Sequence, residues 1–335
     1  MRHAGLKKIM TRGVSATIVV LALVVCASLT ACQGGSRTKL NIGGGLNISM
    51  LAIVAEQEGF FKAQGVDAEF HTLQNGKVAF DAVAANQMDL GIVTDANIAA
   101  LGHAGLGDVR VLGTITSKTD DALVARRDAH IATPADLNGK KIAYVPAGTS
   151  EVFLALFAKA RGIDLQGDKP IVMTAQAMQA AITHRDVDAV SVWQPFRLNI
   201  MSALGANGIE FVNGGVYPAD ILLIAKQQTL SARSGEVIKV LKALVAASQY
   251  IKTHREESIT LLAKAIGVDR DSLDKSWAEY QFGVSADPAL NSHLDDVAGA
   301  FAVIEPGFDK GGQPDFTPYL DQSLVANLTG AAVSR

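Results

Sequence analysis

Two stretches of this chain decide the fold: residues 82–94 read AVAANQMDLGIVT, and residues 181–193 read AITHRDVDAVSVW. Each begins like the end of a helix, passes through a polar turn that closes with Asp89 or Asp188, and continues as an apolar run of strand length. We expect both aspartates to have structural roles in their turns. Helix-turn-strand units recur in α/β proteins generally, so the repeat is compatible with two related lobes but does not require them.

The segments around this repeat alternate between strands and helices. The predicted strands are residues 39–42, 66–73, 90–93, 109–116, 122–126 and 140–145, and the predicted helices are residues 49–58, 77–85 and 149–161. Such alternation is typical of βαβ units and mostly parallel sheets, so the expected fold class is α/β. In the last third of the chain, apolar residues such as Val237, Leu241 and Leu244 recur at a helical period, which indicates core packing.

Thr94 and Trp193 occupy equivalent positions when the two halves of the repeat are aligned on their aspartates. Both follow the carboxyl end of a predicted strand, which is the edge at which open α/β sheets bind ligands. Two such lobes would place these edges face to face across a cleft. A tryptophan followed by Gln194 suits a pocket wall with one amide, although Trp193 could instead close the local core.

A glycine-rich turn follows the first predicted strand and includes Gly44, Gly45 and Asn47. Glycine lets a backbone approach a ligand closely, which makes these three residues candidates for ligand contact. A flexible turn without a ligand is the alternative. The spacing matches neither a dinucleotide-binding fingerprint nor a P-loop.

Gly148, Thr149 and Ser150 lie between a predicted strand and a strongly apolar helix. The free N–H groups of the first helical turn, the helix dipole and the two hydroxyl groups together favour an anion, such as a sulfonate or a carboxylate. Simple N-capping by Thr149 or Ser150 is the alternative, and it is compatible with ligand binding. Asp95 could pair with an ammonium group of a ligand, but a cap on the helix that follows it is favoured.

The beginning of the chain has the pattern of a bacterial lipoprotein signal. Four basic residues precede an apolar run, and the sequence LTAC at residues 29–32 follows it. This pattern predicts that residues 1–31 are removed, that Cys32 is lipidated and that residues 32–38 form a flexible tether. Lipid would then hold the protein at the cell membrane, facing the periplasm or the cell exterior. An uncleaved signal anchor is the alternative, although the apolar run is only marginally long enough to span a bilayer.

Composition and residue spacing argue against several classes of function. Removal of the four basic side chains would change the net charge from −3 to −7, and no basic stripe remains for nucleic acid. Cys32 would be the only mature cysteine, so lipidation leaves no thiol for a disulfide, a metal site or catalysis. The histidines lack metal-ligand spacing, and no nucleophile elbow or catalytic carboxylate pair is present. These absences lower the expectation of an enzyme without excluding one, and we expect neither a metal nor another cofactor.

Several short motifs, taken in order, resemble those of solute-binding lipoproteins of ABC importers. They are AEQEGFF at 55–61, MDLG at 88–91, DLNGKKIA at 136–143, GTS at 148–150 and WQPF at 193–196. The nearest branch is the nitrate/sulfonate/bicarbonate and thiamine-precursor binding family. The resemblance covers residues 39 to about 304, which is most of the mature chain.

The resemblance implies a type II periplasmic-binding-protein-like fold, with two α/β lobes joined by a two-strand hinge. Residues 39–121 and 221–322 would form lobe 1, and residues 122–220 would form lobe 2. The residues implied to line the cleft are Gly44, Thr94, Gly148, Thr149, Ser150 and Trp193. Family members often have glutamate where this chain has Gln194, and loss of that negative charge favours an anionic ligand.

The function implied is the capture of a small, sulfonate-like anion and its delivery to a permease that a cytoplasmic ATPase drives. We expect a monomer that binds its ligand without covalent chemistry. One alternative is a biosynthetic enzyme of the same fold, of the thiamine-pyrimidine or menaquinone type. The pyrimidine synthases carry a cysteine-rich motif that this chain lacks. Another alternative is a ligand-sensing lipoprotein, which the sequence does not separate from a transport protein.

Overall fold

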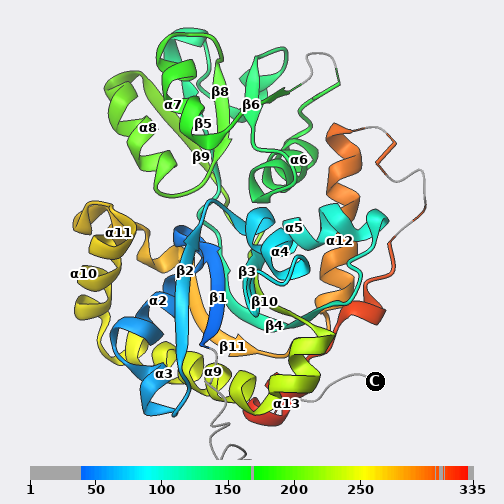
Figure 1. Cartoon of the computed structure of the whole chain (residues 1–335). Helices are drawn as coiled ribbons and strands as arrows, with labels where there is room; N and C mark the ends of the chain where they lie inside the picture. Colours follow the sequence, from blue (N-terminus) through cyan, green and yellow to red (C-terminus); the bar gives the residue numbers. More distant parts are fainter. Residues whose placement is uncertain (1–38, 167–169, 306, 309–311, 313, 331–335) are drawn as a thin grey trace, which may run out of the picture. The chain divides into compact units, whose positions relative to one another are not determined.

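The structure is a computed structural model that describes residues 39–166, 170–305, 307–308, 312 and 314–330 (Figure 1). The predicted signal peptide, the lipidation site Cys32 and the tether lie outside the described residues. From Lys39 onward the chain belongs to one compact unit. In the part of the chain that is described, no helix combines the length and the apolar character needed to cross a membrane.

A six-stranded sheet forms the centre of the first lobe, with the strand order β11-β4-β10-β3-β1-β2. Its strands are β1 (Leu40–Gly45), β2 (Ala68–Leu73), β3 (Leu90–Thr94), β4 (Val109–Lys118), β10 (Ala219–Lys226) and β11 (Tyr280–Ser285). β1 pairs in parallel with β2 and β3, whereas β10 is antiparallel to both β3 and β4, and β11 is antiparallel to β4.

A five-stranded sheet forms the centre of the second lobe, with the strand order β7-β6-β8-β5-β9. Its strands are β5 (Ala122–Arg126), β6 (Ile142–Tyr144), β7 (Ile171–Val172), β8 (Ala189–Val192) and β9 (Gly208–Val212). β6 is parallel to β7 and β8, while β5 is antiparallel to β8 and β9. Both sheets are therefore mixed, and the expected parallel pairing holds only for the strands that helices connect. The chain passes between the lobes twice, from β4 to β5 and from β9 to β10. In the first sheet β4 pairs antiparallel with β10, and in the second sheet β5 pairs antiparallel with β9.

Helices surround both sheets (Figure 1). Those of the first lobe are α2 (Met50–Gln57), α3 (Phe60–Ala63), α4 (Gly76–Ala84), α5 (Asp95–Leu101), α9 (Gln227–Thr253), α10 (Arg255–Ile266), α11 (Arg270–Ser276), α12 (Leu290–Ile304) and α13 (Ser323–Thr329). Those of the second lobe are α6 (Thr149–Arg161), α7 (Ala175–Thr183) and α8 (Phe196–Leu204). Short 3-10 turns include η1 (Leu46–Ile48) before α2 and η6 (Trp277–Glu279) before β11.

The apolar core continues from one lobe into the other along α6 and α12. Phe153 and Phe157 of α6 belong to the same buried cluster as Leu294 and Phe301 of α12. Separate clusters lie beneath α2 and α9 in the first lobe and beneath α7 and α8 in the second lobe. The two lobes are therefore joined by packed side chains as well as by the two chain crossings.

The predicted repeat is present, once in each lobe. In the first lobe it runs from α4 through a turn to β3, and in the second lobe from α7 through a turn to β8. Asn86 and Arg185 occupy the same place in the two turns, and both adopt a left-handed backbone conformation, with φ of 58° and 68°. The same turn geometry is therefore built twice.

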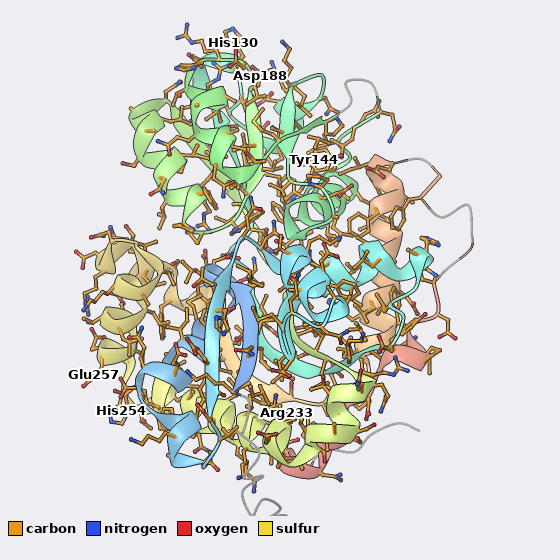
Figure 2. All side chains as sticks on the ribbon, in the orientation of Figure 1. His130, Tyr144, Asp188, Arg233, His254 and Glu257 are labelled. Carbon is orange, nitrogen blue, oxygen red and sulfur yellow. The ribbon has the colours of Figure 1, made fainter. Side chains whose placement is uncertain are left out.

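The aspartates of the two turns make matching hydrogen bonds. Asp89 accepts the backbone N–H of Asn41 at 2.8 Å and a guanidinium N–H of Arg233 at 3.0 Å. Asp188 accepts the backbone N–H of Lys141 at 3.1 Å and a guanidinium N–H of Arg126 at 2.8 Å. Figure 2 shows Arg233 within the first lobe and Asp188 at the edge of the second lobe that faces away from the first. Asp89 thus ties its turn to β1, and Asp188 ties its turn to the residue just before β6, which is the structural role predicted for both.

Candidate functional site

A cavity of about 50 Å³ is lined by residues of both lobes. Its lining residues include Asn47 of η1, Met50 at the start of α2, Gln194 and Leu198 around the start of α8, and Asp269 and Leu273 at α11. One water needs roughly 10–15 Å³ of such space, so this volume holds a few waters or a small solute group. Among the described residues that line it, none is a lysine, an arginine or a histidine.

Trp193 and Gln194 form the turn between β8 and α8, at the carboxyl end of a buried strand. Trp193 Nε1 and Gln194 Nε2 are buried and have no hydrogen-bond partner among the described residues. Both groups are obligate donors, and leaving a buried donor unpaired costs about 1–3 kcal/mol. A ligand that presents acceptor atoms at this turn would remove that cost.

The other polar atoms of Gln194 are already used. Its Oε1 accepts the backbone N–H of Leu198 at 3.3 Å, and its own backbone N–H donates to Asp120 at 3.2 Å. The side-chain amide is therefore held in one orientation, with its free donor remaining for an external partner.

The prediction of a turn at Gly44 and Gly45 is wrong: both are the last residues of strand β1, where they serve packing within the first lobe. A Cβ atom on Gly44 would lie 2.2 Å from Ser49 Oγ, and one on Gly45 would lie 3.3 Å from the Cα atom of Asn75. Neither glycine is among the residues that line the cavity, whereas Asn47 is. Ser49 Oγ is a further buried group without a partner in the described part of the chain, and sequence reasoning did not single it out.

Thr94 caps α5, and its hydroxyl oxygen serves as an acceptor within the protein. Its Oγ1 accepts the backbone N–H of Asn97 at 3.2 Å, and its own N–H donates to Asn97 Oδ1 at 3.0 Å. Asn97 Nδ2 then donates to the carbonyl oxygen of Ala147, in the second lobe, at 2.8 Å. Asn97 was missed as a residue that links the lobes, although its spacing from Thr94 is that of a capping box.

Asp95 is completely buried, and its carboxylate is occupied by protein groups. It accepts hydrogen bonds from the hydroxyl group of Tyr217 at 2.6 Å, the backbone N–H of Asp220 at 2.9 Å and His293 Nε2 at 2.7 Å. Burial lowers the pKa of His293, but the hydrogen bond and charge of Asp95 outweigh it, so the pKa lies above its ordinary value. In this structure Asp95 is not available to an ammonium group of a ligand, because it joins the start of α5 to β10 and α12. The cap predicted for Asp95 is instead made by Thr94.

Thr149 and Ser150 use their hydroxyl groups within the protein. Thr149 Oγ1 donates to Asp121 at 2.8 Å, and Ser150 Oγ donates to the carbonyl oxygen of Ser191 at 2.7 Å. The N-cap residue of α6 is Gly148, not a serine or threonine. The expected hydroxyl donors for an anion are therefore engaged, and only backbone N–H groups remain at this helix end.

Glu151 adds a second obstacle to an anion at the start of α6. It lies in the first turn of that helix, and its Oε2 accepts the backbone N–H of Ala147 at 2.8 Å. Its Oε1 is buried and lacks a partner among the residues that are described. Burial raises the pKa of Glu151 to about 7, so near neutral pH it is partly charged and repels an anion.

Lys118 and Arg197, two basic side chains near the junction of the lobes, each pair with two carboxylates. Lys118 Nζ donates to Asp120 and, at 2.8 Å, to Asp121. Arg197 of α8 contacts Glu210 of β9 and Glu279 of η6, each at 2.8 Å. The geometry therefore offers a ligand neutral donors and not a free cation. Within the described residues, no group of three or more His, Cys, Asp or Glu side chains is placed to hold a metal ion.

A more open groove of about 550 Å³ runs along β11. Its walls include Arg255, Trp277 and Phe282, and Tyr280 lines both this groove and the cavity. None of the residues predicted for ligand binding lines the groove, so the cavity beside Gln194 is the better candidate site.

Comparison with known proteins places this fold and site in context. The sequence model of the NMT1/THI5-like family matches residues 48–258. A putative aliphatic sulfonates-binding protein of Escherichia coli is 25% identical over 258 residues, which covers 69% of this chain and 79% of that protein. A putative binding protein of Brucella abortus is 24% identical over 267 residues, covering 76% of this chain and 81% of that protein.

Solved structures show the same fold. The periplasmic aliphatic sulphonate binding protein SsuA of Escherichia coli superposes with a TM-score of 0.73 at 19% identity, covering 87% of this chain and 99% of that one. The desulfurization enzyme DSZB superposes with a TM-score of 0.58 at 16% identity, covering 88% and 99%. The expected periplasmic-binding-protein fold is thereby confirmed, and because the family's sequence model spans more than half of the chain, this protein belongs to the NMT1/THI5-like family.

Proposed function

We propose that this chain is the extracytoplasmic solute-binding component of an ABC importer, and that it captures a small organic anion between two lobes. The proposed lobes are residues 39–121 with 221–322, and residues 122–220. Family membership supports a binding role, and relatives of similar length carry the names of binding proteins for aliphatic sulfonates. Passage of the solute to a permease, driven by an ATPase, completes the proposal.

One observation carries the choice of ligand: the unpaired buried groups at the β8–α8 turn are donors. Trp193 Nε1 and Gln194 Nε2 both need an acceptor, and Gln194, though not Trp193, lines the cavity that reaches the first lobe at Asn47. Sulfonate and carboxylate oxygens are strong acceptors, and hydrogen bonds to charged groups exceed neutral ones in strength. An acceptor-rich head group therefore fits this turn better than an ammonium group does.

Closure of the lobes around such a solute is supported by bonds that cross between them. Arg197 of the second lobe contacts Glu279 of the first, and Asn97 of the first lobe donates to Ala147 of the second. A ligand that touches both lobes adds contacts found only in the closed form, and so selects that form.

We also propose that lipid on Cys32 holds the protein outside the cytoplasmic membrane. The support is the pattern of basic residues, apolar run and LTAC at the beginning of the chain. Intact mass of the protein from a membrane fraction tests this: the expected product begins at Cys32 and carries acyl chains. An unacylated chain that retains Met1 would contradict the anchor.

A non-enzymatic role is part of the proposal, although the fold also occurs in a desulfurization enzyme. The two cysteines of the chain lie at positions 26 and 32, so residues 39–335 contain no thiol for covalent catalysis. Turnover of a sulfinate or pyrimidine substrate by the purified protein would favour the enzyme instead.

Calorimetric titration tests ligand class directly. We expect ethanesulfonate to bind the purified protein, and the uncharged analogue ethyl methyl sulfone to bind at least tenfold more weakly. Trp193→Phe keeps the ring but removes the donor, so it should weaken ethanesulfonate binding by about 5- to 150-fold, equivalent to about 1–3 kcal/mol. Trp277→Phe is the matched control and should leave affinity unchanged. Binding of small amines but of no anion would contradict the proposal.

A further inference from the structure

We infer that Asp120 and Asp121 are positioning residues: Asp120 holds the β8–α8 turn that carries the free donors, and Asp121 holds the start of α6. Both lie in the short segment that carries the chain from β4 into β5. This inference rests on the proposed function, because it concerns the β8–α8 turn that would meet the solute. Sequence reasoning singled out neither residue.

Asp120 holds the turn that contains the free donors. Its Oδ2 accepts the backbone N–H of Gln194 at 3.2 Å and the hydroxyl group of Tyr280 at 2.8 Å. The backbone carbonyl of Asp120 also accepts a guanidinium N–H of Arg197 at 3.3 Å. One residue therefore links the turn after β8, the start of α8 and the first strand residue of β11.

Asp121 holds the other turn, at the start of α6. Its Oδ1 accepts the hydroxyl group of Thr149 at 2.8 Å, and its Oδ2 accepts Lys118 Nζ at 2.8 Å. Thr149 is the first residue of α6, so this bond sets the distance between that helix end and the chain crossing.

Lys118 joins the two aspartates from the last position of β4. Its ammonium group is almost completely buried and donates to both carboxylates. Burial alone would lower the pKa of Lys118, but the two carboxylates outweigh it and keep the ammonium charged. The segment therefore has a fixed charge pattern that orients both aspartates at once.

The place of Asp120 and Asp121 in the fold supports a positioning role beyond stabilisation. The crossing at residues 119–121 connects the lobes, and the side chains of these two aspartates also accept hydrogen bonds from the turn after β8 and from the start of α6. A ligand that fixes Trp193 and Gln194 therefore acts on the crossing through Asp120. The bonds around Asp188 lie at the opposite end of β8 and touch neither turn, so they provide a matched control.

The fluorescence of Trp193 reports the turn directly, before any ligand is added. The chain has two tryptophans, so Trp277→Phe leaves Trp193 as the only one. In that background we compare Asp120→Asn with Asp188→Asn. Asparagine offers one acceptor oxygen and cannot serve both Lys118 and the Gln194 N–H. We expect Asp120→Asn to shift the emission of Trp193 to longer wavelength and to increase its quenching by acrylamide, and Asp188→Asn to do neither.

A second variant covers the case in which Asp120→Asn fails to fold. Tyr280→Phe removes one donor to Asp120 without changing any charge, and it should shift Trp193 emission in the same direction by a smaller amount. Unchanged Trp193 emission in every folded variant of Asp120 and Tyr280 would overturn the inference, whatever the effect on stability.

Titration with ethanesulfonate completes the test and separates the two proposals. We expect Asp120→Asn to weaken binding at least tenfold, and Asp188→Asn to change it by less than twofold. Equal weakening in both variants would assign Asp120 a purely structural role. If the unmodified protein binds neither ethanesulfonate nor any other small anion, the proposed function fails, while the ligand-free fluorescence still decides whether Asp120 positions the turn.

Discussion

The two helix-turn-strand repeats match at one end of their strands and differ at the other. Before the strands, Asp89 and Asp188 make the same kinds of bonds to a neighbouring strand and to an arginine. After the strands, Thr94 closes a capping box with its own helix, whereas the turn at Trp193 leaves buried donors unpaired. Residues that build the scaffold are thus duplicated, whereas among the described residues of the two repeats the unpaired buried donors lie only at the end of the second.

The difference has a simple energetic basis. A buried donor without a partner is unfavourable, so a turn that only completes the fold pairs its polar groups internally, as Thr94 does. The second repeat keeps a destabilising arrangement at Trp193 and Gln194, which is expected where binding and stability compete. Variants in one repeat or the other test whether the two differ in this way.

The largest expected effect is on stability, in the first repeat. Asp95→Ala leaves Tyr217 and His293 without their buried partner, and removal of one member of a buried charged pair costs about 3–5 kcal/mol. We expect a loss of that size in the free energy of unfolding, measured with urea. A stable Asp95→Ala protein that has lost ligand binding would instead place Asp95 in the site.

A pH dependence should distinguish the first helical turns of α2 and α6. α6 has buried Glu151 in its first turn, while α2 has no acidic residue there. The pKa of Glu151 rises from 4.5 to about 7 on folding, so the folded state binds the proton more tightly. Its contribution to stability is complete below pH 4.5 and is lost as the pH rises to 7, by up to about 3 kcal/mol.

Glu151→Gln tests that pH dependence. The amide oxygen can still accept the Ala147 N–H, but the side chain no longer titrates. We expect the free energy of unfolding of this variant to fall less between pH 4.5 and 7 than that of the unmodified protein. If the free energy of unfolding changed with pH in the same way for both proteins, ionisation of Glu151 would not destabilise the folded state.

Loss of the turn aspartates should have similar effects in the two repeats. Asp89→Asn and Asp188→Asn each weaken bonds to an arginine and to a strand N–H, and we expect each to cost about 1–3 kcal/mol in the free energy of unfolding. Thermal or urea denaturation measures both. A loss of stability in only one of the two variants would show that the matching hydrogen bonds do not contribute equally to the free energy of unfolding.

The smallest expected effect is a gain in stability from the second repeat. Gln194→Met removes the unpaired amide donor together with the long bond that Oε1 accepts from the Leu198 N–H, so we expect the free energy of unfolding to rise by less than about 1 kcal/mol. Ligand affinity should fall in the same variant. A loss of stability would mean that the bond to Leu198 outweighs the unpaired donor.

Much of the fold followed from local sequence pattern. The helix predicted at residues 149–161 has those bounds in the structure, and Gly267 ends α10 in the left-handed conformation expected of a C-cap. The repeat, with both of its aspartates, was also visible. The antiparallel strands β10 and β11 were not, because their partners lie far away in the sequence.

The candidate site could be predicted only in part. Asn47 and Gln194 line the cavity, whereas Trp193, which carries an unpaired donor, is not among its lining residues. Thr149 and Ser150 looked like ligand donors because hydroxyl groups at a helix start are usually free or capping. Nothing local revealed that their partners are Asp121 and the carbonyl oxygen of Ser191.

Periodicity and turn chemistry act over a few residues, so the linear chain was enough to specify many of the helices and the duplicated turns, and to suggest an edge for a ligand. Which polar groups remain unpaired at that edge is set by contacts between residues tens to hundreds of positions apart. Asp120 meeting Tyr280, and Asp95 meeting His293, are such contacts. A buried hydrogen bond requires both partners to be brought together, and only the folded arrangement does this.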